Sequence, residues 1–177
     1  MFATLNRDMH PTIYTRHDSA FGPLLLLAQD GYLTGLYFAD QLHAPAIDTA
    51  WRRDDDDSLF TQIIREVSEF ASGERHAFSL PFAASGTPFQ KLVWREIAAI
   101  PFGETRSYGE IASRLGAFAR AVGSATGRNP LSLVVPCHRV VGTNGALTGY
   151  AGGLQRKRQL LELESTATFA SCSAVAA

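Results

Sequence analysis

The stretch V-V-P-C-H-R-V-V-G, residues 134–142, places Cys137, His138 and Arg139 side by side. A cysteine reacts as its thiolate, and a free thiol has a pKa of about 8.5, so at neutral pH it needs a base, a cation or a helix N-terminus nearby. Neighbours in an extended strand point to opposite faces, so a relay between Cys137 and His138 requires a turn or a bridging water. Pro136 fixes one backbone angle before the cysteine, which favours a turn.

The same three residues also fit a structural interpretation. Free cysteines are often buried and unreactive, so Cys137 could be a small core residue. His138 could be an ordinary core or surface histidine, and Arg139 could belong to a buried ion pair. The stretch by itself leaves both interpretations open, so the surrounding elements must decide between them.

Composition predicts a globular protein of one compact domain or two small ones, since 46% of the 177 residues are hydrophobic and 19% are charged. The two cysteines, Cys137 and Cys172, form no disulfide framework, and no Cys/His set has zinc spacing. Residues 1–18 lack the apolar core of a signal peptide, and the apolar run at 23–28 is too short to cross a bilayer. We expect a cytoplasmic, intracellular protein without a metal or a membrane anchor.

Charge is distributed unevenly along the chain. Residues 1–90 hold 6 basic and 12 acidic residues, a balance of −6, whereas residues 91–165 hold 10 basic and 5 acidic residues, a balance of +5. A basic half beside an acidic half indicates that only the second half meets a polyanion. Chance variation of the surface is the alternative.

The first half is predicted to be a small sheet with one helix. Asp30-Gly31 is a strong hairpin signal, and residues 44–57, with four consecutive aspartates, are predicted to be a solvated loop. Leu59 to Phe70 has helical periodicity. Strands are expected at residues 12–16, 23–28, 32–38 and 78–82.

A change of composition near residues 83–86 marks the expected domain boundary. Thr87 can cap a helix with Pro88 at its first position. Ser107 and Glu110 form a capping box for the next helix, and Gly116 is its expected end. With a further short helix at residues 118–126, this arrangement is typical of a helix-turn-helix, although ordinary helical hairpins look alike.

The remaining segments are predicted from their composition. Residues 131–135 should be extended, and residues 142–153 should form a glycine-rich loop. Residues 154–164 should form a helix whose cluster at 156–158 is a solvated basic face with some attraction for phosphate. Residues 165–177 should be frayed.

At this point the chain resembles a known family. The segments G-T-P-F-Q-K-L-V-W (86–94), I-P-F-G-E-T-R-S-Y-G-E-I-A (100–112), A-R-A-V-G-S-A-T-G-R-N-P (119–130), V-V-P-C-H-R-V-V-G (134–142), L-T-G-Y-A-G-G-L (147–154) and R-K-R-Q-L-L-E-L-E (156–164) are similar to those of the O6-alkylguanine-DNA alkyltransferases, also called methylated-DNA–protein-cysteine methyltransferases. The resemblance implies an α/β, ribonuclease-H-like domain of small sheet plus helix at 1–83. It also implies a mainly α domain with a winged-helix-like helix-turn-helix at 84–165, and a disordered tail at 166–177.

The resemblance also implies an activity. The protein would bind double-stranded DNA as a monomer from the minor groove and flip an O6-alkylguanine out of the stack. Cys137 would accept the methyl or other alkyl group in one self-inactivating turnover, without a cofactor. O4-alkylthymine is a further expected substrate.

Roles for individual residues come from the same resemblance. Cys137 is the acceptor, His138 its base through a water, and Glu164 the residue that orients His138. Asn129 is a buried hinge, Tyr108 faces the flipped base and donates a proton to the departing guanine, and Arg120 replaces the base in the stack. The expected DNA contacts are Tyr108, Ala119, Arg120, Ala121 and Ser124, and the expected substrate pocket comprises Val140, Tyr150, Ala151 and Gly152.

The chain departs from the family in the turn between the two short helices. Leu115 to Phe118 leads directly into Arg120, about two residues shorter than the proline-containing turn usual in the family, so we predict weakened DNA binding. Two other functions remain open: a non-catalytic DNA lesion sensor or regulator, and a Cys-His hydrolase. Sensors of this kind replace the cysteine, which this chain keeps, and no hydrolase signature is present.

Overall fold

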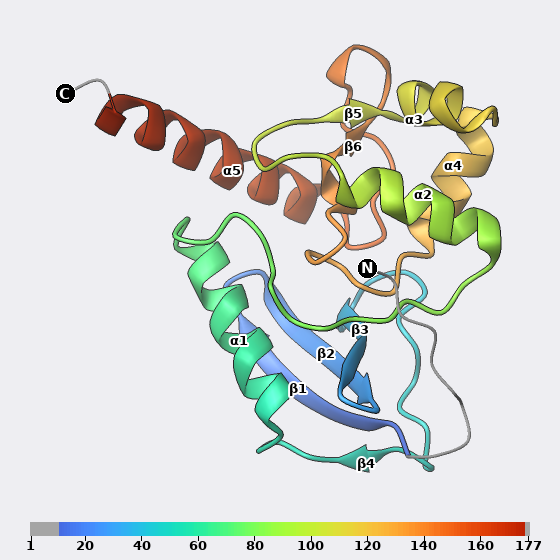
Figure 1. Ribbon diagram of the computed structural model, residues 1–177, viewed down its shortest axis with the longest axis vertical. Coiled ribbons are helices and arrows are strands. Elements are labelled where there is room, and N and C mark those ends of the chain that lie inside the picture. Colours follow the sequence, from blue (N-terminus) through green and yellow to red (C-terminus); the bar gives the residue numbers. More distant parts are fainter. Residues whose placement is uncertain (1–10, 176–177) are drawn as a thin grey trace.

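The structure, a computed structural model, describes the backbone of residues 11–175 and the side chains of residues 11–167. A sheet with one helix forms the N-terminal part, and a group of helices lies over it to form the C-terminal part (Figure 1). Within the described residues, no helix combines the length and apolar character needed to span a bilayer.

The sheet has the strand order β3-β2-β1-β4. Antiparallel pairs join β1 (Ile13–Ser19), β2 (Gly22–Gln29) and β3 (Tyr32–Phe38), which confirms the first three predicted strands. Asp30 and Gly31 have φ of 52° and 76°, the left-handed conformation that a tight hairpin requires. The loop predicted at 44–57 contains a short strand that the sequence did not indicate, β4 (Arg52–Arg53), which runs parallel to β1.

Helix α1 (Ser58–Ala71) packs on one face of this sheet (Figure 1). The Asp57 side chain caps it by accepting a hydrogen bond from the Leu59 amide. The predicted helical stripe is buried, and Ile63 and Val67 join the core. Because the C-terminal part covers the sheet as well, β2 is buried along most of its length rather than at alternate residues.

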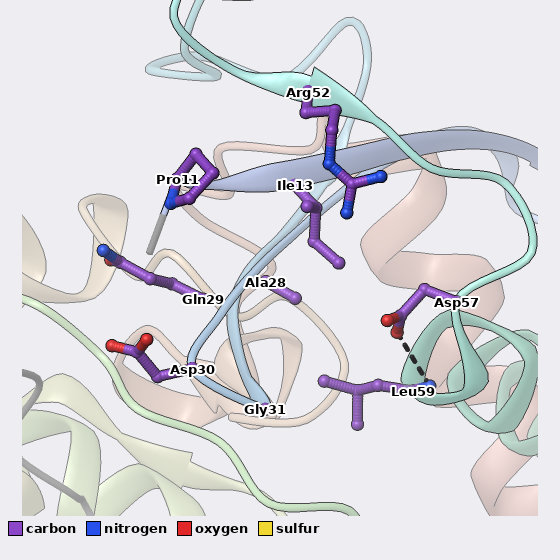
Figure 2. A pocket seen from close by; sticks show the side chains of 9 residues that line it. All are labelled: Pro11, Ile13, Ala28, Gln29, Asp30, Gly31, Arg52, Asp57 and Leu59. Carbon is purple, nitrogen blue, oxygen red and sulfur yellow. Dashed lines mark hydrogen bonds between the residues drawn. The ribbon is translucent and has the colours of Figure 1, made fainter. Parts of the chain in front are cut away.

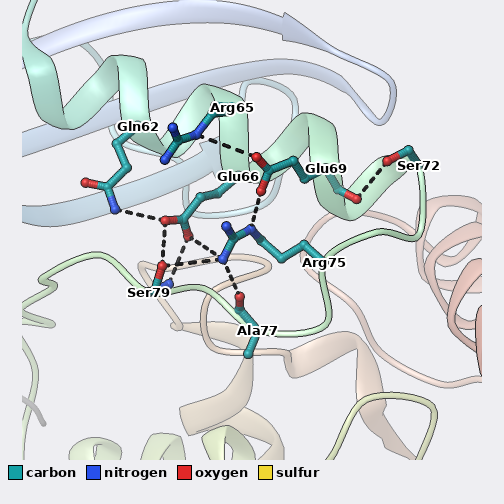
Figure 3. A network of polar contacts seen from close by, with 8 residues as sticks. All are labelled: Gln62, Arg65, Glu66, Glu69, Ser72, Arg75, Ala77 and Ser79. Atoms are coloured by element: carbon teal, nitrogen blue, oxygen red, sulfur yellow. Dashed lines mark hydrogen bonds and ion pairs between the residues drawn. The ribbon is translucent and has the colours of Figure 1, made fainter.

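A buried carboxylate fixes the linker that leaves α1 (Figure 3). Glu66 is fully buried and accepts hydrogen bonds from Gln62 Nε2 and from the amide and hydroxyl of Ser79, and Arg75 lies 3.5 Å away. The strand predicted at residues 78–82 was wrong. Only Phe82 forms a single bridge to Leu33, because Pro81 has no amide hydrogen with which to continue a ladder.

Three helices follow, and their ends match the capping signals in the sequence. Capping boxes begin α2 (Pro88–Ala98) at Thr87 and α3 (Tyr108–Leu115) at Ser107, and Gly116 ends α3 with a φ of 59°. The third helix, α4 (Ala119–Gly127), packs on both α2 and α3. The pair α3–α4, joined by a tight turn, has the connectivity predicted for a helix-turn-helix.

The extended run predicted at residues 131–135 was wrong. Leu131 makes one bridge to Leu36, and the chain then turns at Leu133, where φ is 69°. After the turn come the 3₁₀ turn η1 (Cys137–Arg139) and the short strand β6 (Val140–Val141), which pairs parallel with β5 (Arg106–Ser107). A second 3₁₀ turn, η2 (Thr143–Gly145), lies in the glycine-rich loop.

The last helix, α5 (Leu154–Val175), is longer than predicted and projects from the body of the molecule (Figure 1). Its backbone is helical to Val175, so the frayed tail expected from Ser165 was wrong over that range. The prediction that residues 156–158 form a solvated basic face was also wrong for two of the three residues. Arg156 joins the two parts, donating to Phe21 O and Gly152 O and pairing with Asp40, and Lys157 is fully buried. Only Arg158 is exposed.

Candidate active site

Two consecutive turns position Cys137. Pro136 has φ −77° and ψ 65°, the conformation of an inverse γ-turn, and the Cys137 amide donates to Val135 O at 2.7 Å. The 3₁₀ turn η1 begins at Cys137, so Cys137 and His138 do not alternate as they would in a strand. The turn required by a Cys-His relay is therefore present. Cys137 is 4% exposed and lines a pocket of about 550 Å³.

Asn129 holds this turn from behind. Its Nδ2 donates to Val135 O at 2.8 Å and contacts Cys137 Sγ at 3.2 Å, while its Oδ1 accepts from the Leu131 amide at 3.0 Å. Asn129 is 3% exposed and is the second residue after the end of α4. One buried amide thus links the end of α4 to the nucleophile, the position expected of a hinge.

A buried charge cluster lies behind the cysteine. His138 Nε2 contacts Glu164 Oε1 at 2.8 Å, and Arg139 Nε lies 3.0 and 3.1 Å from the two oxygens of that carboxylate. The Gly103 amide also donates to Glu164, and Arg139 Nη1 donates to Ile100 O. The structure therefore supports two interpretations together: Arg139 forms the buried ion pair, and Glu164 orients His138.

Burial and charge shift the pKa values of these groups in different directions. Burial lowers the pKa of His138 despite its contact with Glu164, which keeps the imidazole neutral at pH 7. Burial alone would raise the pKa of Glu164, but His138 and Arg139 outweigh it and hold that pKa below its ordinary value. His138 Nδ1 is buried and has no hydrogen-bond partner among the described residues. A neutral imidazole with one free nitrogen can accept a proton.

Burial raises the pKa of the Cys137 thiol, and the hydrogen bond from Asn129 and the charge of Lys157 act in the opposite direction. Lys157 is the residue that the sequence interpretation missed. Its Nζ donates to Val140 O at 2.5 Å and to Thr148 O at 2.7 Å, and burial lowers its pKa to about 8. The charge of this ammonium group lowers the pKa of the Cys137 thiol, and its two hydrogen bonds join β6 to the glycine-rich loop.

The pocket beside Cys137 has a mostly apolar wall with a few polar groups, as small-molecule sites do. Tyr108 lies on this wall, and its hydroxyl donates to Gly149 O at 2.9 Å. The Tyr150 hydroxyl is buried without a hydrogen-bond partner among the described residues. The residues that line the pocket are Leu42, Tyr108, Ala119, Gly123, Thr126, Gly127, Cys137, Thr148, Gly149, Tyr150 and Ala151.

Two residues predicted for this pocket do not line it. Val140 is fully buried in β6, and its carbonyl accepts from Lys157. Gly152 instead borders a smaller pocket at the junction of the two parts, where Arg156 and Asp40 also lie. Leu42, which comes from the N-terminal part, was not predicted, and its amide donates to Ala151 O at 2.9 Å.

The residues predicted to contact DNA gather on one surface. Ala119, Arg120, Ala121 and Ser124 are all exposed on α4, and Ala119 also lines the pocket. The surface and the site of Cys137 are therefore adjacent, as delivery of a base to the cysteine would require.

Another hollow lies between β1, the β2–β3 turn and the start of α1 (Figure 2). Its volume is about 380 Å³, and its polar side chains include Asp30, Arg52 and Asp57. Asp57 already caps α1, and the hollow holds no nucleophile. The described residues contain no cluster of three or more His, Cys, Asp or Glu side chains suited to a metal ion.

Comparison with known proteins decides the family. The model of the 6-O-methylguanine DNA methyltransferase DNA-binding domain matches residues 88–166, and that of the ribonuclease-like domain of the same proteins matches residues 12–84. The chain belongs to the 6-O-methylguanine DNA methyltransferase family. This membership confirms the resemblance seen in the sequence.

Individual members are similar over most of their length. The methylated-DNA–protein-cysteine methyltransferase of Mycobacterium tuberculosis (strain ATCC 25618 / H37Rv) is 45% identical over 155 residues, which cover 86% of this chain and 92% of the relative. That of Methanosarcina acetivorans is 41% identical over 86% of this chain and 98% of the relative. The crystal structure of Mycobacterium tuberculosis OGT in complex with DNA has a TM-score of 0.80 at 44% identity, covering 88% of this chain and 94% of that one.

Proposed function

We propose that the protein repairs alkylated DNA by transferring the alkyl group from guanine O6 to Cys137 Sγ. One observation carries the proposal: in a chain of this family, Cys137 lines a pocket of about 550 Å³ and the His138–Glu164 pair lies directly behind it. The protein is thus a methylated-DNA–protein-cysteine methyltransferase. Each molecule acts once, because the thioether that forms is stable.

The transfer requires one bond to form and one to break. Cys137 loses its proton to His138, through a water at the free Nδ1, and the charge of Lys157 favours the thiolate. Sγ then attacks the alkyl carbon, an S–C bond forms, and the O6–C bond breaks to leave a guanine anion. Tyr108, whose pKa is raised to about 12 mainly by burial, stays protonated at neutral pH and donates a proton to that anion. The proton held by His138 then leaves to solvent, and solvent restores the Tyr108 hydroxyl, so that the net transfer is one proton from Cys137 to guanine.

The DNA complex is proposed from the surface of α4. Duplex DNA lies with its minor groove against Ala119, Ala121 and Ser124, whose small side chains allow a close approach. Arg120 fills the place of the extruded base. The protein binds as a monomer through a winged-helix-like unit at residues 84–165, with the ribonuclease-H-like unit at residues 1–83 supporting it.

Intact-protein mass measurement tests the proposal. We expect incubation with a duplex containing O6-methylguanine to add one methyl group to each molecule, and Cys137→Ala to remain unmodified although it still binds the duplex. An unmodified duplex serves as the control. Binding without a mass change would favour a lesion sensor, and continued turnover would favour a hydrolase, so either result rejects the proposal. A duplex with O4-methylthymine tests the second substrate in the same way.

A further inference from the structure

Phe118 is the most exposed large apolar side chain among the described residues, at 82%. It is the residue immediately before α4, with Ala117 alone between it and the end of α3 at Gly116. The connection between α3 and α4 is too short to turn the Phe118 ring toward the core. The side chain therefore stands in solvent at the start of the helix.

Folding does not explain a phenylalanine at this position. The residue before a helix stabilises it best when it is Ser, Thr, Asp or Asn, whose oxygen accepts from a free amide. Phe118 makes no such bond, and only its backbone carbonyl takes part, accepting from the amides of Ala121 and Val122. Both its exposure and its lack of a capping group therefore disfavour stability, which points to a role outside the fold.

The neighbours of Phe118 point to DNA. Ala119 lines the pocket of Cys137, and Arg120 is exposed next to it. The side chain of Arg114 on α3 is 59% exposed and lies 3.6 Å from Glu96, and Arg128 is exposed at the opposite end of α4 from Phe118. An exposed ring close to Arg120, on a helix with an exposed arginine near each end, suits a polyanion with apolar bases better than it suits an apolar protein surface.

We propose that Phe118 is a second DNA-contact residue, which packs against the base pair next to the extruded nucleotide while Arg120 fills the gap. The proposal rests on the proposed function. Apolar side chains inserted between base steps are a common way for minor-groove proteins to bend and unstack DNA. An aromatic ring also stacks on any base, so the contact works without a preferred sequence. Phe118 in this way would offset part of the loss of DNA affinity that we predict for the short turn.

Replacement of the ring by a capping residue separates binding from folding. Phe118→Ser should raise the melting temperature, because serine caps α4, and should weaken binding to an O6-methylguanine duplex roughly tenfold. Fluorescence anisotropy titrations over a range of salt concentrations measure this loss. The slope of affinity against salt should stay unchanged, since no charge is removed. Phe118→Trp should retain the affinity.

Leu92→Ala is the matched control, because Leu92 is 45% exposed on α2 and does not line the pocket. Transfer from free O6-benzylguanine, which needs no DNA, should proceed at the same rate in wild type and Phe118→Ser. The proposal is overturned if Phe118→Ser binds the duplex as tightly as wild type, or if it slows transfer from the free base equally. Failure of the wild type to bind the duplex would instead reject the proposed function.

Discussion

Glu164 is the residue on which the charges of the site converge. It contacts His138, the base of the proposed relay, and pairs with buried Arg139. The adjacency of Cys137 and His138 drew attention to the site, but no local signal in the sequence connects Glu164 to them. Its role came only from the family resemblance, because the contact spans 26 residues and depends on the packing of α5.

Glu164→Gln should destabilise the protein by about 3 kcal/mol at pH 7, since it leaves Arg139 buried without a counter-ion. The folded-state pKa of Glu164 lies below its ordinary value of 4.5, so the stabilisation is present above that value and is lost as pH falls through the folded-state pKa. The acid slope of the free energy of unfolding should therefore be smaller in the variant. Urea titrations from pH 3 to pH 7 measure both the loss of stability at pH 7 and the slope at acid pH, with Glu162→Gln as the exposed control. Equal slopes would contradict the pairing.

Lys157 was missed because three adjacent basic residues looked like a solvated face. Helical spacing could have identified it: Lys157, Leu160 and Glu164 repeat at intervals of three and four, and all three are buried on the same side of α5. A buried lysine costs stability unless its charge is used. Here the charge lies close enough to affect the pKa of Cys137.

Lys157→Met should slow single-turnover transfer roughly tenfold at pH 7, because the pKa of the Cys137 thiol rises when the positive charge beside it is lost. Because Lys157 has a pKa of about 8, it is charged at pH 7 and loses that charge at higher pH. The difference between wild type and variant should therefore shrink above pH 8. Rates measured from pH 6.5 to 9.5 test this, with the exposed neighbour substituted as Arg158→Met for comparison. A pH-independent difference would assign Lys157 a purely structural role.

At the scale of elements, the sequence predicted what local rules determine. Capping residues and periodicity located α1, α2 and α3, and the Asp30-Gly31 turn located the hairpin. The prediction failed at residues 131–135, where an apolar run that resembles a strand instead turns at Leu133. That turn is held by Asn129, so the contact that shapes the site also overrides the local preference.

The turn between α3 and α4 remains a prediction about function. Its shortness should set the angle of α4 and limit the reach of Arg120 into DNA. Insertion of Pro-Gly after Ala117 should therefore tighten binding to an O6-methylguanine duplex several-fold in gel-shift titrations. Insertion of the same dipeptide after Asn144, in the exposed turn η2, controls for a general effect of insertion. Unchanged affinity would show that the short turn does not limit binding.

At the scale of the whole molecule, the N-terminal part does more than support the C-terminal part. Leu42 enters the pocket wall, Ser132 donates to Gln41 across the junction, and Arg156 stacks over Phe38 with its guanidinium carbon 4.2 Å from the ring centroid. The sequence could not predict this junction, because its contacts join residues about 90 to 135 positions apart. Cys137 belongs to one continuous core of buried side chains from both parts.

Alkylation of Cys137 should for this reason destabilise the whole protein. The sulfur is packed against Asn129 Nδ2 at 3.2 Å, and overpacking such a site by one methyl group typically costs about 1–3 kcal/mol. The open pocket on the other side gives the methyl group room, so we expect the free energy of unfolding to fall by about 1 kcal/mol and the melting temperature by roughly 2–4 °C.

A benzyl group on Cys137 should lower the melting temperature further. Calorimetry before and after reaction with O6-methylguanine DNA, and after O6-benzylguanine, measures the series, with Cys137→Ala exposed to the same reagents as the control. Equal melting temperatures for the unmodified, methylated and benzylated protein would mean that the pocket accommodates the product without strain, and that alkylation does not change the stability of the fold.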